Sequence, residues 1–439
     1  MQILELINKA SEFYNQENYK LAHKYVDKVL RIDSHNSLAL TIKGNILYQN
    51  QQIKDSLYYY QQALLSDSQN FTAQINLANT YFELKNYAQS YQYAQQVLAA
   101  NPTDKTALTI YGNSAIELEK YDDAKSAFLR ILETYPDDSW SYNSLSQIYQ
   151  KTEDFERALS CGWKAVELSN GDENHHINFG YLLYEISLYS SSDSVQKYAK
   201  LWINNYENNH IVQHMGNSVL NNQKIKRANA GYVQDIFDAF APEFEDVLST
   251  LNYNVPQLIS AEVSRLYDKK IKILDIGCGT GLCGKFLHKY SKFLGLYGVD
   301  ISEKMLEKAK QKKIYNCLIN DDLEHFFQHN KKHFDLIVSA DVFTYFGDLQ
   351  KLILGCYGSL NFGGRIIFSV SKNTVNNSHY FLHTSGRFLH HKNYIENILV
   401  AHHFSIEKIE EKILRNEGEN KVLGYIVVAS KKVKKNSTI

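Results

Sequence analysis

Small residues recur every 34 positions through the first 172 residues, and this period constrains the fold more than any other feature of the chain. In successive rows of 34 that begin at residue 3, the eighth position holds Ala10, Gly44, Ala78, Gly112 and Ser146. The twentieth position holds Ala22, Ser56, Ser90, Ala124 and Ala158. Small side chains let two antiparallel helices approach closely. One helical hairpin cannot bury its apolar face alone, so the sequence predicts five hairpins stacked on one another.

The period and the small residues resemble the tetratricopeptide repeat over residues 3–172. That resemblance implies a docking module for a protein or peptide, and no catalysis by the repeats. The ninth position of four rows would line the groove, and it holds Asn45, Asn79, Asn113 and Gln147. Such carboxamides can hydrogen-bond an extended peptide backbone, although plain solvation explains them equally well. We expect a degenerate sixth unit from Glu173, with its second helix at 195–206 displaced by the insertion SSSDS.

Charge divides the chain into two halves of opposite sign. Residues 1–210 hold 17 Lys and Arg against 25 Asp and Glu, a balance of −8, whereas the remainder holds 30 against 23, a balance of +7. We therefore predict a repeat array over 1–210, a linker with lead-in helices over 211–259, an α/β domain over 260–432 and a basic tail over 433–439. The net charge of −1 gives the whole chain no bias toward nucleic acid or membrane.

The five cysteines show no metal-binding pattern. No CxxC pair occurs, which indicates a reducing compartment and no metal cluster. The N-terminus lacks the apolar core of a signal peptide, and no run of about 18 apolar residues is present. We therefore expect a cytoplasmic protein with no metal, nucleic-acid or membrane partner.

Strands and helices alternate from residue 271 onward. Apolar runs predict strands at 271–276, 294–300, 317–320, 333–342 and 363–370, and a late pair at 404–414 and 422–430. Repeated strand–helix units indicate a parallel sheet with helices on both faces. The predicted fold class is thus an α-solenoid of helical hairpins followed by an α/β sheet with a terminal antiparallel strand pair. Ligands of such sheets bind at the carboxyl ends of the strands.

Three glycines alternate directly after the first of these strands, in LDIGCGTG (274–281). Without Cβ atoms, the backbone at Gly277, Gly279 and Gly281 can turn sharply and touch a ligand. Gly279, Gly281 and Gly284 also spell the dinucleotide pattern GxGxxG. The turn nearest the strand end is Gly277, however, and Asp275 sits in the strand itself. A phosphate gains nothing from that carboxylate, whereas a cationic amino-acid ligand does.

Four motifs in order resemble the Rossmann-like S-adenosylmethionine-dependent methyltransferases. They are LDIGCGTG (274–281), GVDIS (298–302), INDDLEHF (319–326) and FDLIVSADVFTYFGDL (334–349), and the resemblance runs from about 230 to 430. With the repeats in front, the chain is similar to predicted bacterial methyltransferases that carry tetratricopeptide repeats. The resemblance implies an enzyme that uses S-adenosylmethionine as cofactor.

The resemblance also implies which residues bind this cofactor. The glycine turn would line its methionine and ribose parts, Asp275 its amino group and Asp300 both ribose hydroxyls. Asp321 or Asp322 would accept the adenine amino group, and Asp322 is preferred because Leu323 follows it. Aromatic residues of the lead-in helix would cover the cofactor, unless they are plain core. The full expected set is Tyr232, Phe240, Asp275, Gly277, Cys278, Gly279, Gly281, Asp300, Ile301, Met305, Asp321, Asp322 and Leu323.

Methyl transfer is an in-line displacement at a sulfonium carbon, so an enzyme chiefly supplies position and a dry pocket. A hydroxyl or acidic-carbon acceptor also needs a base. The candidates are His391, Asp341 and Tyr345, with His390 beside them. Arg387 and the two histidines lie in an insert before the late strands, where pairing with surface carboxylates explains them as well.

Three functions remain open from the sequence. The first is methylation of a small molecule or carrier-bound metabolite, with the repeats docking a protein. The second is methylation of a protein or peptide that the repeat groove captures. The third is a non-catalytic scaffold with a methyltransferase-like fold. The sequence names no acceptor.

Overall fold

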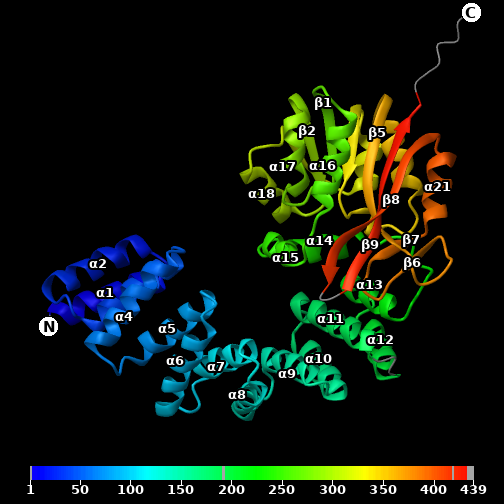
Figure 1. Cartoon of the computed structure of the whole chain (residues 1–439). Coiled ribbons are helices and arrows are strands. Elements are labelled where there is room, and N and C mark those ends of the chain that lie inside the picture. Colours follow the sequence, from blue (N-terminus) through cyan, green and yellow to red (C-terminus); the bar gives the residue numbers. More distant parts are fainter. Residues whose placement is uncertain (1, 190–192, 418–419, 433–439) are drawn as a thin grey trace, which may run out of the picture. The chain divides into compact units, whose positions relative to one another are not determined.

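The computed structural model describes residues 2–189, 193–417 and 420–432. It divides into two compact units, Met1–Leu182 and Leu183–Ile439, and the boundary falls within helix α11 (Glu173–Tyr189). Figure 1 shows both units, each of which is described by itself below. Of the predicted features, the serines at 190–192 and the tail at 433–439 lie outside the described residues.

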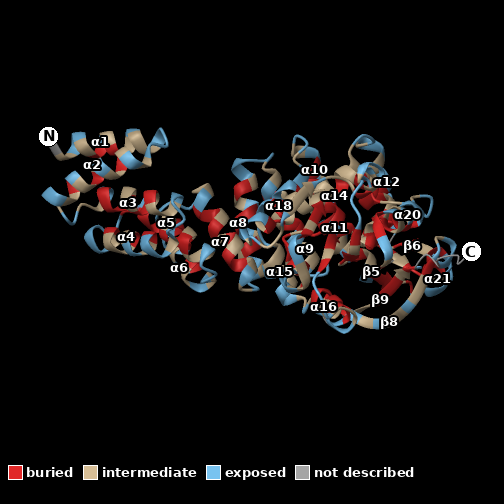
Figure 2. Ribbon diagram, turned by 90° about the horizontal axis from the view of Figure 1, so that it is seen from above, coloured by how far each residue is buried: buried red, intermediate tan, exposed pale blue. Residues whose placement is uncertain are grey.

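The first unit consists of helical hairpins, which confirms the predicted repeats. The paired helices are α1 (Gln2–Asn15) with α2 (Tyr19–Ile32), α3 (Ser37–Gln49) with α4 (Ile53–Ser66), α5 (Phe71–Glu83) with α6 (Tyr87–Ala100), α7 (Lys105–Glu117) with α8 (Tyr121–Thr134) and α9 (Ser139–Lys151) with α10 (Phe155–Leu168). Every small residue at the eighth and twentieth positions is buried. Buried residues line the facing sides of these helices (Figure 2).

A left-handed residue joins the two helices of each hairpin. The five residues with this backbone conformation are spaced 34 apart and have φ values of 57–62°: Glu17, Gln51, Lys85, Glu119 and Glu153. None is glycine, although the left-handed region costs other residues about 1 kcal/mol or more. Local backbone hydrogen bonds of a helix C-terminal cap hold this conformation: in the first hairpin, the N–H groups of Glu17 and Asn18 donate to the carbonyls of Tyr14 and Phe13, each at 2.9 Å.

Gly44→Ala should destabilise the repeat unit. A Cβ atom on Gly44 would lie 2.5 Å from Cε1 of Tyr60 on the paired helix. Overpacking of this kind costs about 1–3 kcal/mol, which the better helix propensity of alanine offsets only in part. We expect a lower melting temperature by circular dichroism, and no change for the exposed control Lys54→Ala. An increase in stability, which Gly→Ala produces at a solvent-exposed helix position, would contradict this packing.

The second unit begins with helices and continues into the sheet. Helices α12 (Asp193–Asn205), α13 (His210–Val219), α14 (Ala230–Phe240), α15 (Phe244–Thr250) and α16 (Val255–Leu266) precede the strands. The strands are β1 (Ile271–Ile276), β2 (Ser291–Asp300), β3 (Cys317–Asn320), β4 (Phe334–Ser339), β5 (Leu360–Lys372), β6 (Tyr380–Leu382), β7 (Phe388–His390), β8 (Phe404–Glu417) and β9 (Asn420–Lys431). Between them lie α17 (Leu282–Leu287), α18 (Glu303–Gln311), α19 (Leu323–His329), α20 (Gln350–Ser359) and α21 (Lys392–Ala401), with 3-10 turns η1 (His288–Tyr290) and η2 (Phe343–Tyr345).

The sheet has the predicted Rossmann-like order. Parallel strands run β3-β2-β1-β4-β5, β9 pairs antiparallel with β5, and β8 pairs antiparallel with β9. Two separate apolar clusters cover the sheet. One includes Val255 and Ile259 of α16, and the other includes Leu352 of α20 and Ile395 of α21. The sheet is therefore buried on both faces, and its carboxyl edge is where a ligand can reach the backbone.

Some predicted boundaries are wrong. The strand predicted at 333–342 ends at Ser339, because Asp341 adopts the left-handed region with φ 60°. Strands β6 and β7 lie in the insert, where the sequence predicted none. None of the described helices has the length and apolar run that a bilayer crossing requires. The described residues also contain no group of three His, Cys, Asp or Glu placed to hold a metal ion.

Candidate active site

The glycine turn (Gly277–Gly281) follows β1 at the carboxyl edge of the sheet. Gly277, Gly279 and Gly281 have φ values of +63°, +53° and +87°, which other residues rarely adopt. Val299 of β2 accepts the Gly277 N–H at 2.7 Å and fixes the start of the turn. A Cβ atom on Gly279 would meet only Cε1 of Phe244, at 3.9 Å. The backbone at Gly279 therefore faces an opening beneath the Phe244 ring.

Asp275 lies fully buried at the end of β1, beside this turn. The Tyr315 hydroxyl donates a hydrogen bond to Oδ2 of Asp275 at 2.6 Å. Oδ1 of Asp275 has no partner among the described residues. Burial raises the pKa of Asp275 from 3.8 to about 7, against the lowering effect of the Tyr315 hydroxyl. The site thus holds an unpaired carboxylate oxygen that a cationic hydrogen-bond donor would satisfy.

The variant Asp275→Asn tests whether the pKa of Asp275 is raised, through the pH dependence of the protein's stability. Because the folded-state pKa of about 7 lies above the ordinary 3.8, the protonated form stabilises the ligand-free protein. That stabilisation is complete below about pH 4 and is lost as the pH rises through 7. We expect the melting temperature of the native chain to fall from pH 5 to 8 more steeply than that of the variant. If the melting temperatures of the native chain and the variant change with pH in parallel, the pKa of Asp275 is not raised.

Asp300 ends β2 and holds the glycine turn from the other side. Its Oδ2 accepts the Gly279 N–H at 2.7 Å, and its Oδ1 accepts the Ser302 N–H at 2.9 Å. Burial raises the pKa of Asp300, and the hydrogen bonds from these N–H groups lower it by less. Each oxygen keeps a further lone pair, so the carboxylate can still accept hydroxyl donors.

The lead-in helices α14 and α15 are fastened over the turn. Asp238 of α14 accepts hydrogen bonds from Oγ of Ser302 at 2.5 Å and from the Lys304 N–H at 3.3 Å. Lys312 donates to the Thr280 carbonyl at 2.6 Å and pairs with Glu245. Half-buried rings of Phe237, Phe240 and Phe244 pack edge to face, with centroids 5.5 and 6.2 Å apart. An aromatic cover therefore lies above Gly279.

The residues predicted to bind adenine lie along the neighbouring strand ends. Asp322 caps α19, accepting the Glu324 N–H at 3.0 Å, and it pairs with Arg227. Asp321 instead pairs with His325, at 2.7 Å. Both carboxylates therefore have partners in the structure, and their contact with adenine stays a prediction.

The other predicted cofactor residues differ in accessibility. Ile301 is half-buried, whereas Met305, Leu323 and Cys278 are buried. A Cβ atom on Gly298 would lie 2.8 Å from Sγ of Cys278, so this side chain points toward β2. Tyr232 is buried against the His214 ring, with centroids 4.1 Å apart, and beside the backbone of Gly386.

A charged cluster lies next to the turn, past the end of β4. Arg415 of β8, only 3% exposed, donates to Oδ2 of Asp341 at 2.9 Å and to Glu417 at 2.8 Å. Oδ1 of Asp341 has no partner among the described residues. Arg387 pairs with Glu417 at 2.9 Å and keeps 31% of its side chain exposed. The cluster therefore offers one unpaired carboxylate oxygen and one partly exposed guanidinium.

Contacts connect this cluster to the glycine turn. Burial acts to lower the pKa of Arg387, but neighbouring Tyr345, Asp341 and Glu417 raise it. The Tyr345 ring lies 5.5 Å from Phe237 of the aromatic cover, centroid to centroid. Asp341 precedes Val342, whose side chain touches the space over Gly277. Two of the three predicted catalytic candidates, Asp341 and Tyr345, thus lie beside the turn.

The two histidines of the insert have structural partners. His391 caps α21, where its Nδ1 accepts the Asn393 N–H at 3.3 Å. His390 is fully buried, its Nε2 lies 2.8 Å from the Phe346 carbonyl, and burial lowers its pKa to about 4. Neither arrangement connects these imidazoles to Asp275 or Asp300.

Sequence reasoning missed several residues that shape the site. Tyr315 contacts Asp275 from 40 positions away, and Arg415 reaches Asp341 from 74 positions away. Asp238 anchors the lead-in helix, and Arg227 pairs with Asp322. No local pattern marks these residues, because each acts on an element distant in sequence.

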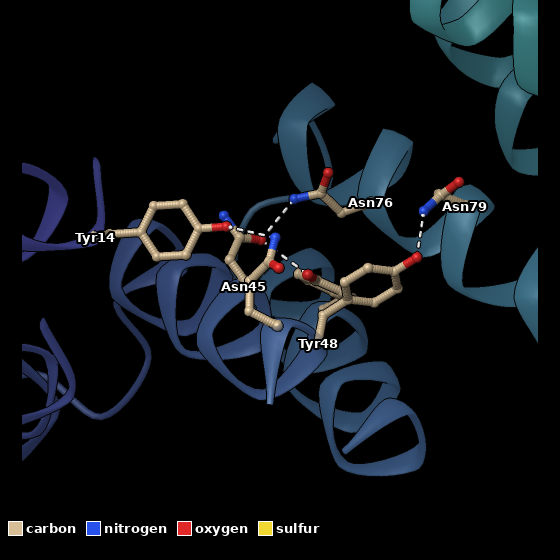
Figure 3. Close-up of a pocket in the computed structure, with 7 residues that line it drawn as sticks. Tyr14, Asn45, Tyr48, Asn76 and Asn79 are labelled. Atoms are coloured by element: carbon tan, nitrogen blue, oxygen red, sulfur yellow. Dashed lines mark hydrogen bonds between the residues drawn. The ribbon is translucent and has the colours of Figure 1, made fainter. Parts of the chain in front are cut away.

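Amide and phenol side chains also line a hollow in the repeat unit. This hollow of about 160 Å³ is bordered by Tyr14, Asn45, Tyr48, Gln49, Tyr60, Asn76 and Asn79. Oδ1 of Asn45 accepts from the Tyr60 hydroxyl at 2.8 Å and from Nδ2 of Asn76 at 2.7 Å (Figure 3). Asn79 donates to the Tyr48 hydroxyl at 3.0 Å (Figure 3). Two of the four predicted groove amides thus bond within the repeats themselves.

Comparisons with known families agree with both halves of this description. A methyltransferase domain model matches residues 274–366, and tetratricopeptide repeat models match residues 7–71 and 127–160. A model of anaphase-promoting complex subunit 3 matches residues 49–131. The chain therefore combines tetratricopeptide repeats with an S-adenosylmethionine-dependent methyltransferase domain.

Curated relatives match parts of the chain. Malonyl-[acyl-carrier protein] O-methyltransferase of Priestia megaterium is 31% identical over 157 residues, which cover 35% of this chain and 54% of the relative. Ubiquinone biosynthesis O-methyltransferase of Coxiella burnetii is 31% identical over 104 residues, 22% of this chain and 42% of the relative. The chain thus spans about half the length of the curated relatives it matches.

Two solved structures match parts of the chain with low similarity. Magnesium protoporphyrin IX methyltransferase from Synechocystis PCC 6803 with bound SAH covers 46% of this chain and 100% of its own, with 17% identity and a TM-score of 0.38. MamA protein covers 39% of this chain and 94% of its own, with 17% identity and a TM-score of 0.35.

Proposed function

We propose that the second unit transfers a methyl group from S-adenosylmethionine to a hydroxyl oxygen of an anionic small molecule or carrier-bound metabolite. The observation that carries the proposal is the buried, unpartnered Oδ1 of Asp275 beside the open backbone of Gly279. A buried carboxylate without a counter-ion is costly. The ammonium group of the methyl donor would supply the missing hydrogen bond and positive charge. The anionic phosphate groups of a nicotinamide dinucleotide would supply neither.

The residues around the turn suit the remaining parts of the donor. When bound, S-adenosylmethionine supplies a methyl group on a positively charged sulfur, which leaves as a neutral thioether. Asp300 would accept the ribose hydroxyls while keeping its backbone partners. Phe237, Phe240 and Phe244 would exclude water from the reacting centre. Rate enhancement would then come chiefly from alignment of acceptor oxygen, methyl carbon and sulfur.

The cluster past β4 would hold the acceptor. Oδ1 of Asp341 needs a hydrogen-bond donor, and an acceptor hydroxyl provides one. Asp341 would take the hydroxyl proton while the oxygen forms its bond to the methyl carbon and the carbon–sulfur bond breaks. A carboxylate acceptor would instead be repelled by Asp341. The exposed part of Arg387 would bind an anionic group elsewhere on the same molecule.

The names of the relatives support an oxygen acceptor. Two of them are O-methyltransferases, one for malonyl-[acyl-carrier protein], whose malonyl group offers a carboxylate oxygen, and one in ubiquinone biosynthesis. Both acceptor types, carrier-bound and small, remain within the proposal.

Asp341→Asn should slow the chemical step without weakening donor binding. Asparagine tolerates the left-handed backbone at φ 60° and keeps an oxygen for Arg415, but it cannot take a proton. We expect kcat to fall about 100-fold and the remaining rate to rise with pH as the acceptor ionises by itself. Glu411→Gln, an exposed carboxylate on β8, serves as control and should keep the native rate. Unchanged kcat would remove Asp341 from the chemistry.

Assays with labelled methyl donor test the proposed function. The full chain would be incubated with extract separated by acceptor size and with purified phenolic acceptors, and a malonyl thioester would serve as the carboxylate comparison. Label in small acidic molecules or on a carrier-bound group, in an ether linkage, is the expected result. Label in an ester would reassign the acceptor to a carboxylate and contradict the role of Asp341.

The second candidate is methylation of a protein or peptide held by the repeats. The amide- and phenol-lined hollow of Figure 3 favours it, because such groups hydrogen-bond peptide backbones. Label that stays in the protein fraction, and is lost with Asn76→Ala, would support this candidate over the first.

A further inference from the structure

Two bulges of equal length, called loops below, interrupt β2 and β5 at the amino-terminal edge of the sheet. Between the pairs Ile271–Ser291 and Ile273–Leu296, β2 advances five residues while β1 advances two. Between the pairs Phe334–Leu360 and Leu336–Arg365, β5 also advances five residues while β4 advances two. The unpaired residues form loops at 292–295, with the sequence KFLG, and at 361–364, with the sequence NFGG.

The two loops also share their backbone shape. The third residue of each is left-handed, Leu294 with φ 54° and Gly363 with φ 76°. The fourth is a glycine packed on the carbonyl of the first: a Cβ atom would lie 2.9 Å from the Lys292 oxygen in one loop and 3.0 Å from the Asn361 oxygen in the other. In both, the second residue is phenylalanine. A leucine held in the left-handed region indicates a loop with a fixed shape.

One carboxylate on β4 anchors both loops. Asp335 accepts hydrogen bonds from Nδ2 of Asn361 at 2.8 Å and from the Lys272 N–H at 2.9 Å. Its Oδ2 also pairs with Nζ of Lys292 at 3.4 Å. Phe293 nevertheless remains 94% exposed, and Leu294 and Phe362 are 57% and 54% exposed. Apolar side chains on anchored loops are thus displayed to solvent, which is unusual for phenylalanine and leucine.

Exposed lysines occupy the same edge between and beside the loops. Lys269 and Lys270 precede β1, Lys331 and Lys332 precede β4, and Lys432 follows β9, which runs antiparallel to β5. Lys431 lies over the Phe362 ring, 5.1 Å from its centroid. Since β1 and β4 separate β2 from β5, the loops are about 14 Å apart at the usual strand spacing. We call Phe293, Leu294, Phe362 and the five exposed lysines the Phe–Lys edge.

We propose that the Phe–Lys edge docks this chain on the surface of a lipid bilayer with anionic headgroups. Lysines are drawn to such headgroups, and aromatic and leucine side chains insert at the interface. A nucleic acid would also attract the lysines. A leucine side chain, however, can neither stack on a base nor hydrogen-bond to it. Phenylalanines about 14 Å apart cannot stack on neighbouring bases.

This docking is compatible with the site and independent of the proposed function. The glycine turn follows the carboxyl end of β1, at the opposite edge of the sheet, so a docked bilayer would leave it open. The sequence alone predicted no membrane partner, because the net charge is −1 and no apolar run is long enough to span a bilayer. The fold gathers lysines that a whole-chain sum conceals.

Co-sedimentation of the full chain with vesicles tests the proposal. We expect binding to phosphatidylcholine vesicles that contain phosphatidylglycerol, weaker binding at high salt, and no binding to phosphatidylcholine alone. Phe293→Ser with Phe362→Ser should weaken binding roughly tenfold or more. Lys331→Gln with Lys332→Gln should weaken it about fivefold per lysine. Leu354→Ser with Val400→Ser removes exposed apolar residues from α20 and α21 and should change nothing.

A second measurement reports insertion directly. In Phe293→Trp, emission should shift to the blue on anionic vesicles and be quenched by brominated lipid tails, relative to the native tryptophans. Failure to bind anionic vesicles overturns the proposal, as does full binding by the double phenylalanine variant. Binding to a single-stranded RNA oligomer in place of vesicles would also overturn it.

Discussion

Gly279→Ala is expected to leave the second unit folded while weakening S-adenosylmethionine binding by about 100-fold or more. The built Cβ atom would lie in open space, with Phe244 3.9 Å away, so no packing is lost. The left-handed φ of +53° adds a cost of about 1 kcal/mol. The new methyl group would project into the opening beside Asp275, where the donor is proposed to lie.

Circular dichroism and calorimetry together measure this effect. The melting temperature should drop by only a few degrees, while the heat of donor binding disappears at ordinary concentrations. Gly358→Ala on α20 is the matched control, since a Cβ atom there meets nothing within 4 Å. If Gly279→Ala binds the donor as tightly as the native chain does, the opening is not the donor site.

Gly277→Ala is expected to have the largest effect on stability. A Cβ atom here would lie 2.2 Å from Cγ2 of Val342, and the backbone has φ +63°. Overpacking and left-handed strain together cost about 3 kcal/mol. For a unit of this size, that lowers the melting temperature by roughly 6–12 °C.

A double variant separates the clash from the strain. Val342→Ala removes both Cγ atoms, so Gly277→Ala with Val342→Ala should recover part of the loss that Gly277→Ala alone produces. The strain from φ +63° should remain. If the stability loss of the double variant equals the sum of the two single losses, Val342 does not set the requirement for glycine at this position.

Local patterns made much of the fold predictable. The helical hairpins repeat because each is built from nearby residues, so small residues at fixed spacing reveal them. The main strands are apolar runs between breaks, which periodicity detects well. The left-handed Glu17 and Lys85 gave no signal, because neither is the glycine that usually marks such a helix C-terminal cap. Strands β6 and β7 span three residues each, too short for a pattern.

The residues of the candidate site that belong to a local sequence motif were predictable. Asp275, Gly277 and Asp300 stand in or directly after apolar strands, which places them at one edge of the sheet. Tyr315 and Arg415 were not predictable, because they meet Asp275 and Asp341 only after folding. His391 was chosen by residue type and position in the insert, yet it caps α21.

The central claim is that Asp275, the glycine turn and Asp300 form a site for a cationic methyl donor. Calorimetric titration of the full chain with S-adenosylmethionine, at pH 6 and pH 8, tests it most directly. We predict saturable one-to-one binding in the range of roughly 1–100 µM, tighter at pH 8 because the donor requires the ionised form of Asp275. That pH dependence should shrink in Asp275→Asn. No heat of binding at either pH, or saturable binding of a nicotinamide dinucleotide in its place, would contradict the account.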